Sequence, residues 1–205
     1  MIAISSIGSL REELAPGRFV VVDQFIDRTV PRPASFFGTG MVAHVSMAEP
    51  VCARLSALCG ASIAAAGGDV AQGGIYLAKE GPQFSTRAEC LMYRQWGADV
   101  IGMTAMPEAK LAREAELPYA LVGMITDYDC WREESTFVEV AQVIEQMTAN
   151  GALDPERRRA GRRGAWAAHR RNLASIPAHA LGTRPKTVGC QAAKAAALAI
   201  SERVG

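Results

Sequence analysis

Five short runs of apolar and β-branched residues recur along the chain, each bounded by glycine, proline or polar residues. These runs are residues 1–5, 18–23, 74–78, 98–104 and 119–126. Runs of this length and composition are typical of buried strands. Helical patterns lie between them at residues 50–66, 87–96 and 107–115. Strands that alternate with helices predict an α/β domain around a largely parallel sheet.

Four further segments complete the predicted organisation. Residues 29–45 combine proline, glycine and aromatic residues with little periodicity, which indicates a long and functional loop. Residues 135–148 carry an amphipathic helical pattern that Gly151 ends. A basic stretch at residues 157–171 is interpreted as a solvated helix face, and residues 190–200 as an alanine-rich helix. We expect residues 1–205 to form a single domain.

The charge balance and the apolar pattern narrow the classes of partner. Lys and Arg total 22 and Asp and Glu total 21, so no large field favours nucleic acid or an anionic membrane. The chain has no apolar run long enough to cross a membrane and no leader pattern at its N-terminus. We therefore expect a cytoplasmic protein that binds a small ligand, with no nucleic acid and no membrane as partner.

The cysteines predict neither a disulfide framework nor a metal site. There are five of them at irregular spacing, with no CxxC pair and no adjacent histidine cluster: Cys52, Cys59, Cys90, Cys130 and Cys190. An odd, unpatterned set of this kind is typical of free buried thiols. We expect no bound metal.

Polar residues follow the predicted strands, where ligands of an open parallel sheet bind. Ser5, Ser6 and Gly8 follow the first strand, residues 80–85 the third, Met103 and Thr104 the fourth, and residues 127–129 the fifth. Together they offer hydroxyls, backbone amides, an aromatic face and two carboxylates.

Asp127 and Asp129 form a carboxylate pair two residues apart. Such a pair can act as general acid and base, bind a metal, grip a heterocycle, or cap the following helix. Tyr128 and Trp131 make the surroundings apolar, which raises the pKa of one carboxyl and leaves a protonated acid able to donate a hydrogen bond. A purine leaving group needs such a donor, because negative charge builds on the base as its glycosidic bond breaks.

Several segments resemble, in order and spacing, the methylthioadenosine phosphorylase branch of the purine nucleoside phosphorylase family. The strongest are EGPQFSTRAE at residues 80–89, GMTAMPE at 102–108 and TDYDCW at 126–131. GSLREE at 8–13, DQFIDRT at 23–29 and His44 before MAEP at 47–50 also match. The resemblance covers about residues 3–150 and implies a three-layer α/β/α phosphorylase/hydrolase-like fold with a largely parallel mixed central sheet.

The resemblance also implies roles for the residues of the base pocket. Phe84 would lie against the purine and Ser85 would help to close the pocket. Met103 would pack under the ribose. Asp127 and Asp129, the catalytic pair, would hold N7 and the 6-amino group, which favours adenine-type nucleosides.

Further roles carried by the resemblance concern the phosphate and the 5′-substituent. Thr104, Ser5 and the backbone of Ser6 would contact phosphate, which is the co-substrate, and no cofactor is implied. His44 would cap the 5′-substituent of a nucleoside held by a neighbouring subunit, which implies a homotrimer. The implied reaction converts 5′-methylthioadenosine and phosphate to adenine and 5-methylthioribose 1-phosphate.

The chain departs from the family pattern before residue 2. Family members carry a further N-terminal segment there, with strands of the sheet, a glycine-rich loop and an Arg-His pair that cradle phosphate. We therefore expect a fold that lacks its N-terminal strands and a much slower phosphorolysis. The alternatives left open are a nucleosidase that uses water, a phosphorylase of other purine specificity, a non-catalytic purine-binding or subunit-interaction module, and a misplaced start codon.

Overall fold

A computed structural model describes residues 1–30, 32–40 and 42–132. The described chain contains three helices and a seven-stranded sheet with the order β3-β5-β6-β1-β7-β2-β4. The strands are β1 (Ile2–Ser9), β2 (Phe19–Val22), β3 (Gln24–Arg28), β4 (Val70–Gln72), β5 (Ile75–Lys79), β6 (Val100–Gly102) and β7 (Ala120–Asp127). The helices are α1 (Ala53–Ala65), α2 (Arg87–Gln95) and α3 (Glu108–Glu114).

The sheet is mixed, and its two changes of direction flank the central strands. The pairs β1/β7, β2/β4, β3/β5 and β5/β6 are parallel, whereas β1/β6 and β2/β7 are antiparallel. The β1/β6 pairing is short, with only Gly8 opposite Ile101 and Ser9 opposite Val100. Beyond this pairing β6 ends, so the sheet opens beside β1.

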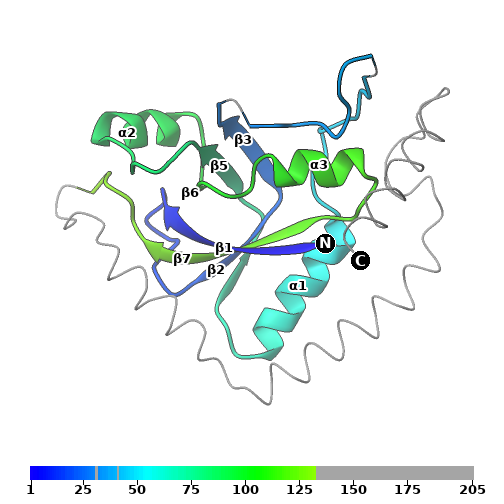
Figure 1. The fold of residues 1–205 in the computed structure, drawn as a ribbon. Helices are drawn as coiled ribbons and strands as arrows, with labels where there is room; N and C mark the ends of the chain where they lie inside the picture. The colour runs from blue at the N-terminus through cyan, green and yellow to red at the C-terminus, as the bar shows by residue number, and fades with distance from the viewer. Residues whose placement is uncertain (31, 41, 133–205) are drawn as a thin grey trace.

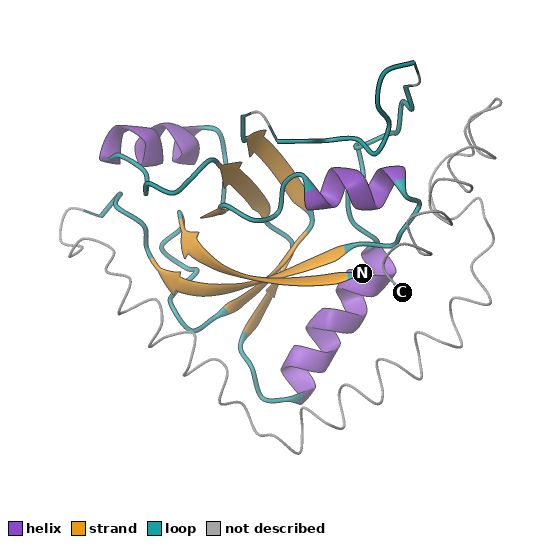
Figure 2. Ribbon diagram, in the orientation of Figure 1, coloured by secondary structure: helices purple, strands orange, loops and turns teal. Residues whose placement is uncertain are grey.

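Helices cover both faces of the sheet, and alternate strand residues show which helix covers which face. Val20 and Val22 of β2 pack in one core with residues of α3, whereas Phe19 and Val21 pack with residues of α1. Leu77 packs with Cys90 and Tyr93 of α2, while its neighbours Tyr76 and Ala78 belong to the α3 core. Because alternate strand residues point to opposite faces, α1 and α2 share one face and α3 covers the other. Figure 1 shows α1 and α3 on opposite sides of the sheet, and Figure 2 shows the sheet as the middle layer.

Local sequence explains where α2 begins and ends. The Thr86 hydroxyl accepts from the Glu89 backbone N–H, and the Glu89 carboxylate accepts from the Thr86 N–H, which completes a capping box. Gly97 follows the helix with φ of 82°, a left-handed conformation that favours glycine at a helix end. The capping box directly follows the segment that bears Phe84 and Ser85, so it fixes the exit of that segment.

The structure confirms the α/β class and the layered architecture, with three differences in detail. Two short strands, β3 and β4, were not predicted. Strand β1 continues to Ser9, so Ser5, Ser6 and Gly8 lie within it and the prediction that they follow a strand was wrong. The cause is pairing: β7 runs beside β1 from Ile2 to Gly8.

Other predictions concern the loop and the C-terminal part of the chain. The described residues of 29–45 contain no helix or strand, as predicted. The predicted helices at 135–148 and 190–200 and the basic stretch at 157–171 lie outside the described residues. Within the described chain, no helix is long and apolar enough to cross a membrane.

Candidate active site

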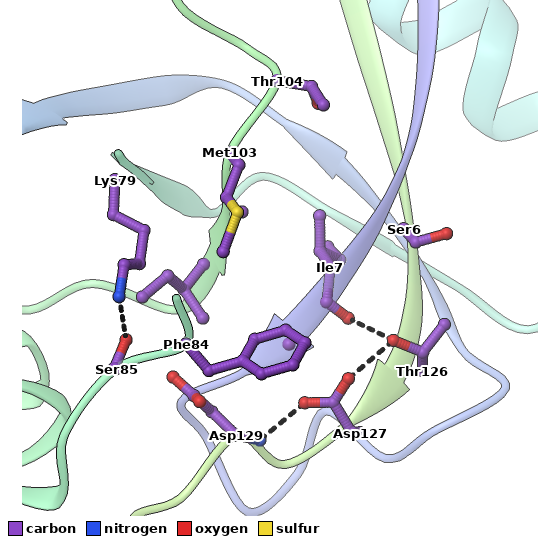
Figure 3. Close-up of a pocket in the computed structure, with 13 residues that line it drawn as sticks. Ser6, Ile7, Lys79, Phe84, Ser85, Met103, Thr104, Thr126, Asp127 and Asp129 are labelled. Carbon is purple, nitrogen blue, oxygen red and sulfur yellow. Dashed lines mark hydrogen bonds between the residues drawn. The ribbon is translucent and has the colours of Figure 1, made fainter. Parts of the chain in front are cut away.

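A cavity of about 280 Å³ opens where β1 and β6 separate. Its walls come from β1, β6, the end of β7 and the segment after β5 (Figure 3). The lining residues are Ser6, Ile7, Gly8, Lys79, Phe84, Ser85, Ile101, Gly102, Met103, Thr104, Thr126, Asp127 and Asp129. The volume lies near the lower end of the range for small-molecule sites.

Asp127 and Asp129 stand together at the end of β7. The Asp129 backbone N–H donates to Asp127 Oδ1 at 2.8 Å, and the Thr126 hydroxyl donates to Asp127 Oδ2 at 2.7 Å. Asp129 has φ of 52°, a left-handed conformation that aspartate tolerates better than most residues, and the residue is only 6% exposed. Each oxygen of Asp127 thus already accepts one hydrogen bond from the protein.

Burial raises the pKa of both carboxyls above the usual aspartate value. The sequence had suggested a raised pKa for one of the two. For Asp129, a hydrogen bond from Cys90 and the nearby charge of Lys79 oppose the effect of burial on its pKa, whereas the charge of Asp127 adds to it. For Asp127 only the hydrogen bonds from Thr126 and Asp129 oppose the effect of burial on its pKa. The two carboxyls therefore share the effect of burial on their pKa and differ in the groups that oppose it.

Gly8 of β1 forms the floor beneath the carboxylate pair. A Cβ at this position would lie 3.0 Å from Asp127 Oδ1, 3.2 Å from Ile101 Cγ2 and 3.4 Å from Asp129 Cβ. A side chain here would be tight against the two nearest of these groups, which would have to shift by a few tenths of an ångström. The close approach brings the carboxyls against the central strand.

The segment after β5 supplies the aromatic face of the cavity. Phe84 is 51% exposed, and its ring lies between the carboxylate pair and the opposite wall (Figure 3). The Ser85 hydroxyl accepts from the Lys79 ammonium at 3.2 Å. Lys79 is the last residue of β5 and is buried, so it places a positive charge inside the cavity.

Arg32 of the long loop ties two walls of the cavity together. Its guanidinium donates to both oxygens of Glu80, with the shortest distance 2.6 Å, and to the backbone carbonyls of Met103 and Met106, each at 2.6 Å. The Met103 side chain in turn packs closely on Gly81, where a Cβ would lie 2.6 Å from the Met103 sulfur and would require that side chain to shift. Arg32 therefore holds the segments after β5 and β6 in register.

The residues predicted to contact phosphate are brought together in part. The hydroxyls of Ser5 and Thr104 lie 2.8 Å apart although the residues are 99 positions apart in sequence. Ser6 lines the cavity, and its hydroxyl is buried without a hydrogen-bond partner among the described residues. These neutral hydroxyls offer donors but no charge.

His44 lies away from this cavity. It is exposed and lines a second cavity of about 390 Å³ with Lys110, Glu114 and residues of the long loop. Nothing in the described chain brings it to the carboxylate pair, and its predicted role involves another subunit.

Sequence reasoning missed three residues that shape the site: Lys79, Thr126 and Arg32. Lys79 directly precedes the family-like segment 80–89, and Thr126 begins the segment 126–131. Their positions beside these segments could therefore have indicated that they belong to the site. Arg32 lies in the loop predicted to be functional, but its partners are 48 or more residues away in sequence.

One group of side chains beside the site has metal-ligating chemistry. Cys90 Sγ, Cys130 Sγ and an Asp129 oxygen lie within 4.8 Å of one another. All four described cysteines are free, with Cys59 and Cys90 buried and the other two half-buried.

Comparison with known proteins identifies the family of the chain. A family model described as the phosphorylase superfamily matches residues 1–153. This match covers more than half of the 205 residues, and the chain therefore belongs to the phosphorylase superfamily.

Its curated relatives include S-methyl-5′-thioadenosine phosphorylases. The enzyme of Cereibacter sphaeroides is 57% identical over 150 residues, which are 73% of this chain and 52% of the relative. The enzyme of Koribacter versatilis is 42% identical over 200 residues, which are 98% of this chain and 62% of the relative. The chain thus spans between 52% and 62% of the length of these two relatives.

Solved structures of the same kind of enzyme share the fold. A methylthioadenosine phosphorylase sourced from an antarctic soil metagenomic library aligns with a TM-score of 0.74 at 40% identity, covering 84% of this chain and 60% of that one. The Schistosoma mansoni methylthioadenosine phosphorylase in complex with adenine aligns with a TM-score of 0.75 at 30% identity, covering 97% of this chain and 70% of that one.

Proposed function

We propose that this chain takes part in the phosphorolysis of 5′-methylthioadenosine to adenine and 5-methylthioribose 1-phosphate, and that it carries the purine-binding side of the active site. The observation that carries the proposal is the carboxylate pair at the end of β7 inside the cavity, with Asp127 half-buried and Asp129 buried. The relatives that are methylthioadenosine phosphorylases, one of them in complex with adenine, support it.

Asp127 acts as the acid toward the purine. Burial raises its pKa and so favours the protonated form. The protonated carboxyl donates to N7 of the base as the glycosidic bond to C1′ breaks and electron density moves onto the purine. Because the Asp127 oxygens also accept from Thr126 and Asp129, the carboxyl is held in one orientation for this task.

Asp129 accepts from the 6-amino group. Burial raises the pKa of Asp129, but the hydrogen bond that the Cys90 thiol donates to Asp129 Oδ2 at 3.1 Å and the charge of Lys79 oppose this effect and favour the ionised carboxylate. A carboxylate can only accept, so it matches the 6-amino group of adenine and opposes the 6-oxo group of hypoxanthine. Phe84 then covers the face of the base, with Ser85 at its edge and Met103 beneath the sugar.

The phosphate side is built from Ser5, Ser6 and Thr104 in this proposal. Their hydroxyls and backbone groups would donate to phosphate oxygens, with phosphate as co-substrate and no further cofactor. Neutral donors bind a dianion less firmly than positive charge does. For this reason a second candidate function is adenine binding without turnover.

The wider organisation follows the same proposal. We infer that residues 1–205 fold as one domain in a cytoplasmic homotrimer, in which His44 contacts the 5′-substituent of a neighbour's nucleoside. The exposed position of His44, in a separate cavity on the long loop, supports a role toward another subunit.

Release of adenine from 5′-methylthioadenosine, measured with and without phosphate, tests the reaction. The proposal predicts release that requires phosphate and is abolished in the Asp127→Ala variant. Release without phosphate would instead indicate a nucleosidase. Adenine binding without any release would favour the second candidate function.

A further inference from the structure

Two cysteine side chains meet directly behind the carboxylate pair. Cys90 on α2 and Cys130 after β7 are 40 residues apart in sequence, and their sulfur atoms lie 2.8 Å apart. Cys90 is fully buried, and its thiol also lies 3.1 Å from Asp129 Oδ2. Cys130 is half-buried and donates to the Ser85 carbonyl at 3.1 Å. The thiol pair thus contacts two residues that line the cavity.

We propose that Cys90 and Cys130 form a reversible disulfide that weakens adenine binding at Asp129. The thiols already lie close enough for a bond with small side-chain movements. Formation of the bond removes the Cys90 S–H that donates to Asp129 and links α2 covalently to the segment after β7. The effect on adenine rests on the function proposed above, whereas the formation of the disulfide does not.

A bound metal ion fits this cluster less well than a disulfide. Two sulfur ligands of a tetrahedral zinc ion, each about 2.3 Å from the metal, are separated by about 3.8 Å. The observed sulfur separation is 2.8 Å, and the cluster contains three ligating side chains where a structural zinc site has four. The contact between the sulfur atoms is therefore closer to a redox pair than to a metal site.

A low-molecular-weight disulfide is a sufficient oxidant. The Cys130 sulfur is the more accessible, so after loss of its proton it attacks one sulfur of the small disulfide and expels the other half as a thiol. The Cys90 thiolate then attacks the Cys130 sulfur and expels the second half. Two protein thiols are oxidised, and one small disulfide is reduced to two thiols.

The surroundings of the thiols set the pace of this exchange. Burial raises the pKa of Cys90, and burial likewise raises the pKa of Cys130. Only the thiolate attacks a disulfide, so the exchange is slow at neutral pH and accelerates as the pH rises. The two thiols therefore stay reduced during brief contact with an oxidant and form the disulfide under sustained oxidation.

Peptide mapping of the full chain after treatment with cystamine tests the bond. Trypsin releases Cys90 on residues 88–94 and Cys130 on residues 114–132, so the disulfide joins two identifiable peptides. The expected product is this linked pair, with a loss of two hydrogen atoms from the intact mass and reversal by dithiothreitol. Cys59→Ser, which removes another buried thiol, should still give the linked pair, and Cys90→Ser should stop at a mixed disulfide on Cys130. A mixed disulfide as the end product of the unsubstituted chain would overturn the proposal.

Adenine titration of the reduced and oxidised chain tests the coupling. Loss of one hydrogen bond to a charged group predicts a rise of the adenine Kd by about tenfold on oxidation, restored by dithiothreitol. An unchanged Kd in a chain with the linked peptides would refute the coupling. Stoichiometric zinc binding that protects both cysteines from cystamine would replace the redox pair with a metal site. A reduced chain that does not bind adenine at all would count against the proposed function and leave the peptide result to decide the disulfide.

Discussion

Replacing Asp127 with asparagine separates the acid role from the shape of the side chain. Asp127 accepts at Oδ1 from the Asp129 N–H and at Oδ2 from the Thr126 hydroxyl, at 2.8 and 2.7 Å. An amide has one accepting oxygen, so in Asp127→Asn one of these buried donors faces an NH2 group. Whichever of the two donors the amide oxygen accepts from, the NH2 group is turned toward the other donor and is not free to point at the base.

The magnitude of the effect follows from this count of donors and acceptors. Leaving one buried donor unsatisfied costs about 1–3 kcal/mol. If the donor is left unsatisfied in the adenine complex, adenine affinity falls by roughly 5- to 150-fold. If it is also left unsatisfied in the free folded chain, the free energy of unfolding decreases by a similar amount.

Isothermal titration with adenine, together with urea unfolding, measures both quantities. The matched control is Asp69→Asn, because Asp69 is a 69% exposed acceptor that pairs with Arg18 at the surface. The control should change neither quantity appreciably. The reasoning is refuted if Asp127→Asn binds adenine within twofold of the unsubstituted chain and unfolds at the same urea concentration.

Three further predictions concern the pH response, the floor and the clamp of the site. Adenine affinity should decrease as pH rises through the raised pKa of Asp127, because the proton proposed to bind N7 is then lost. An adenine Kd that stays constant from pH 5 to 9 would contradict this. The free energy of unfolding should also decrease as pH rises. Because burial raises the pKa of Asp127, its stabilising contribution is complete below the unfolded-state pKa of about 3.9 and is lost as pH rises through the folded-state pKa. Urea unfolding at several pH values measures this loss. Gly8→Ala places a methyl group 3.0 Å from Asp127 Oδ1, so adenine affinity should fall and the free energy of unfolding should decrease by about 1–3 kcal/mol. Gly38→Ala is the neutral control, because nothing lies within 4 Å of a Cβ at that position. Arg32→Lys loses the paired contacts to Glu80 and the Met103 carbonyl, so the adenine Kd should rise more than tenfold. The control Arg18→Lys should leave the Kd unchanged. Equal effects of the two variants would show that Arg32 does not hold the two cavity walls together.

The fold class was readable from the chain because buried strands and helices leave different periodicities. Strand β7 and helix α2 were predicted within a residue of their observed ends. Strand β4 has only three residues, too few for a periodic pattern. Strand β3 follows β2 after Asp23 alone, so the two strands resemble one run, although β2 pairs with β7 and β3 with β5.

The positions of Ser5 and Thr104 in the site could not be predicted, because they depend on the relative direction of the strands. The prediction placed the candidate site residues after the ends of parallel strands, and Phe84 and Asp129 do follow the ends of β5 and β7. Ser5 lies inside β1 instead and meets Thr104 because β1 and β6 run antiparallel. Strand direction depends on long-range pairing, which one sequence does not reveal.

Lys79 was missed for a different reason. Lysine is almost never fully buried unless it is paired, so a lysine at the end of an apolar strand is normally assigned to the surface. In the structure it is buried and donates to Ser85 within the cavity. The contact between Cys90 and Cys130 was equally hidden, since it joins a helix and a strand end.

Competition between adenine and hypoxanthine tests most directly the claim that the cavity is a 6-aminopurine site. In the proposed complex Asp129 accepts from the 6-amino group of adenine, whereas the 6-oxo group of hypoxanthine would place an acceptor against the carboxylate. The account predicts that adenine binds to the full chain and that hypoxanthine binds at least tenfold more weakly, with the difference reduced in Asp129→Ala. Equal binding of the two bases, or a preference for hypoxanthine, would contradict it.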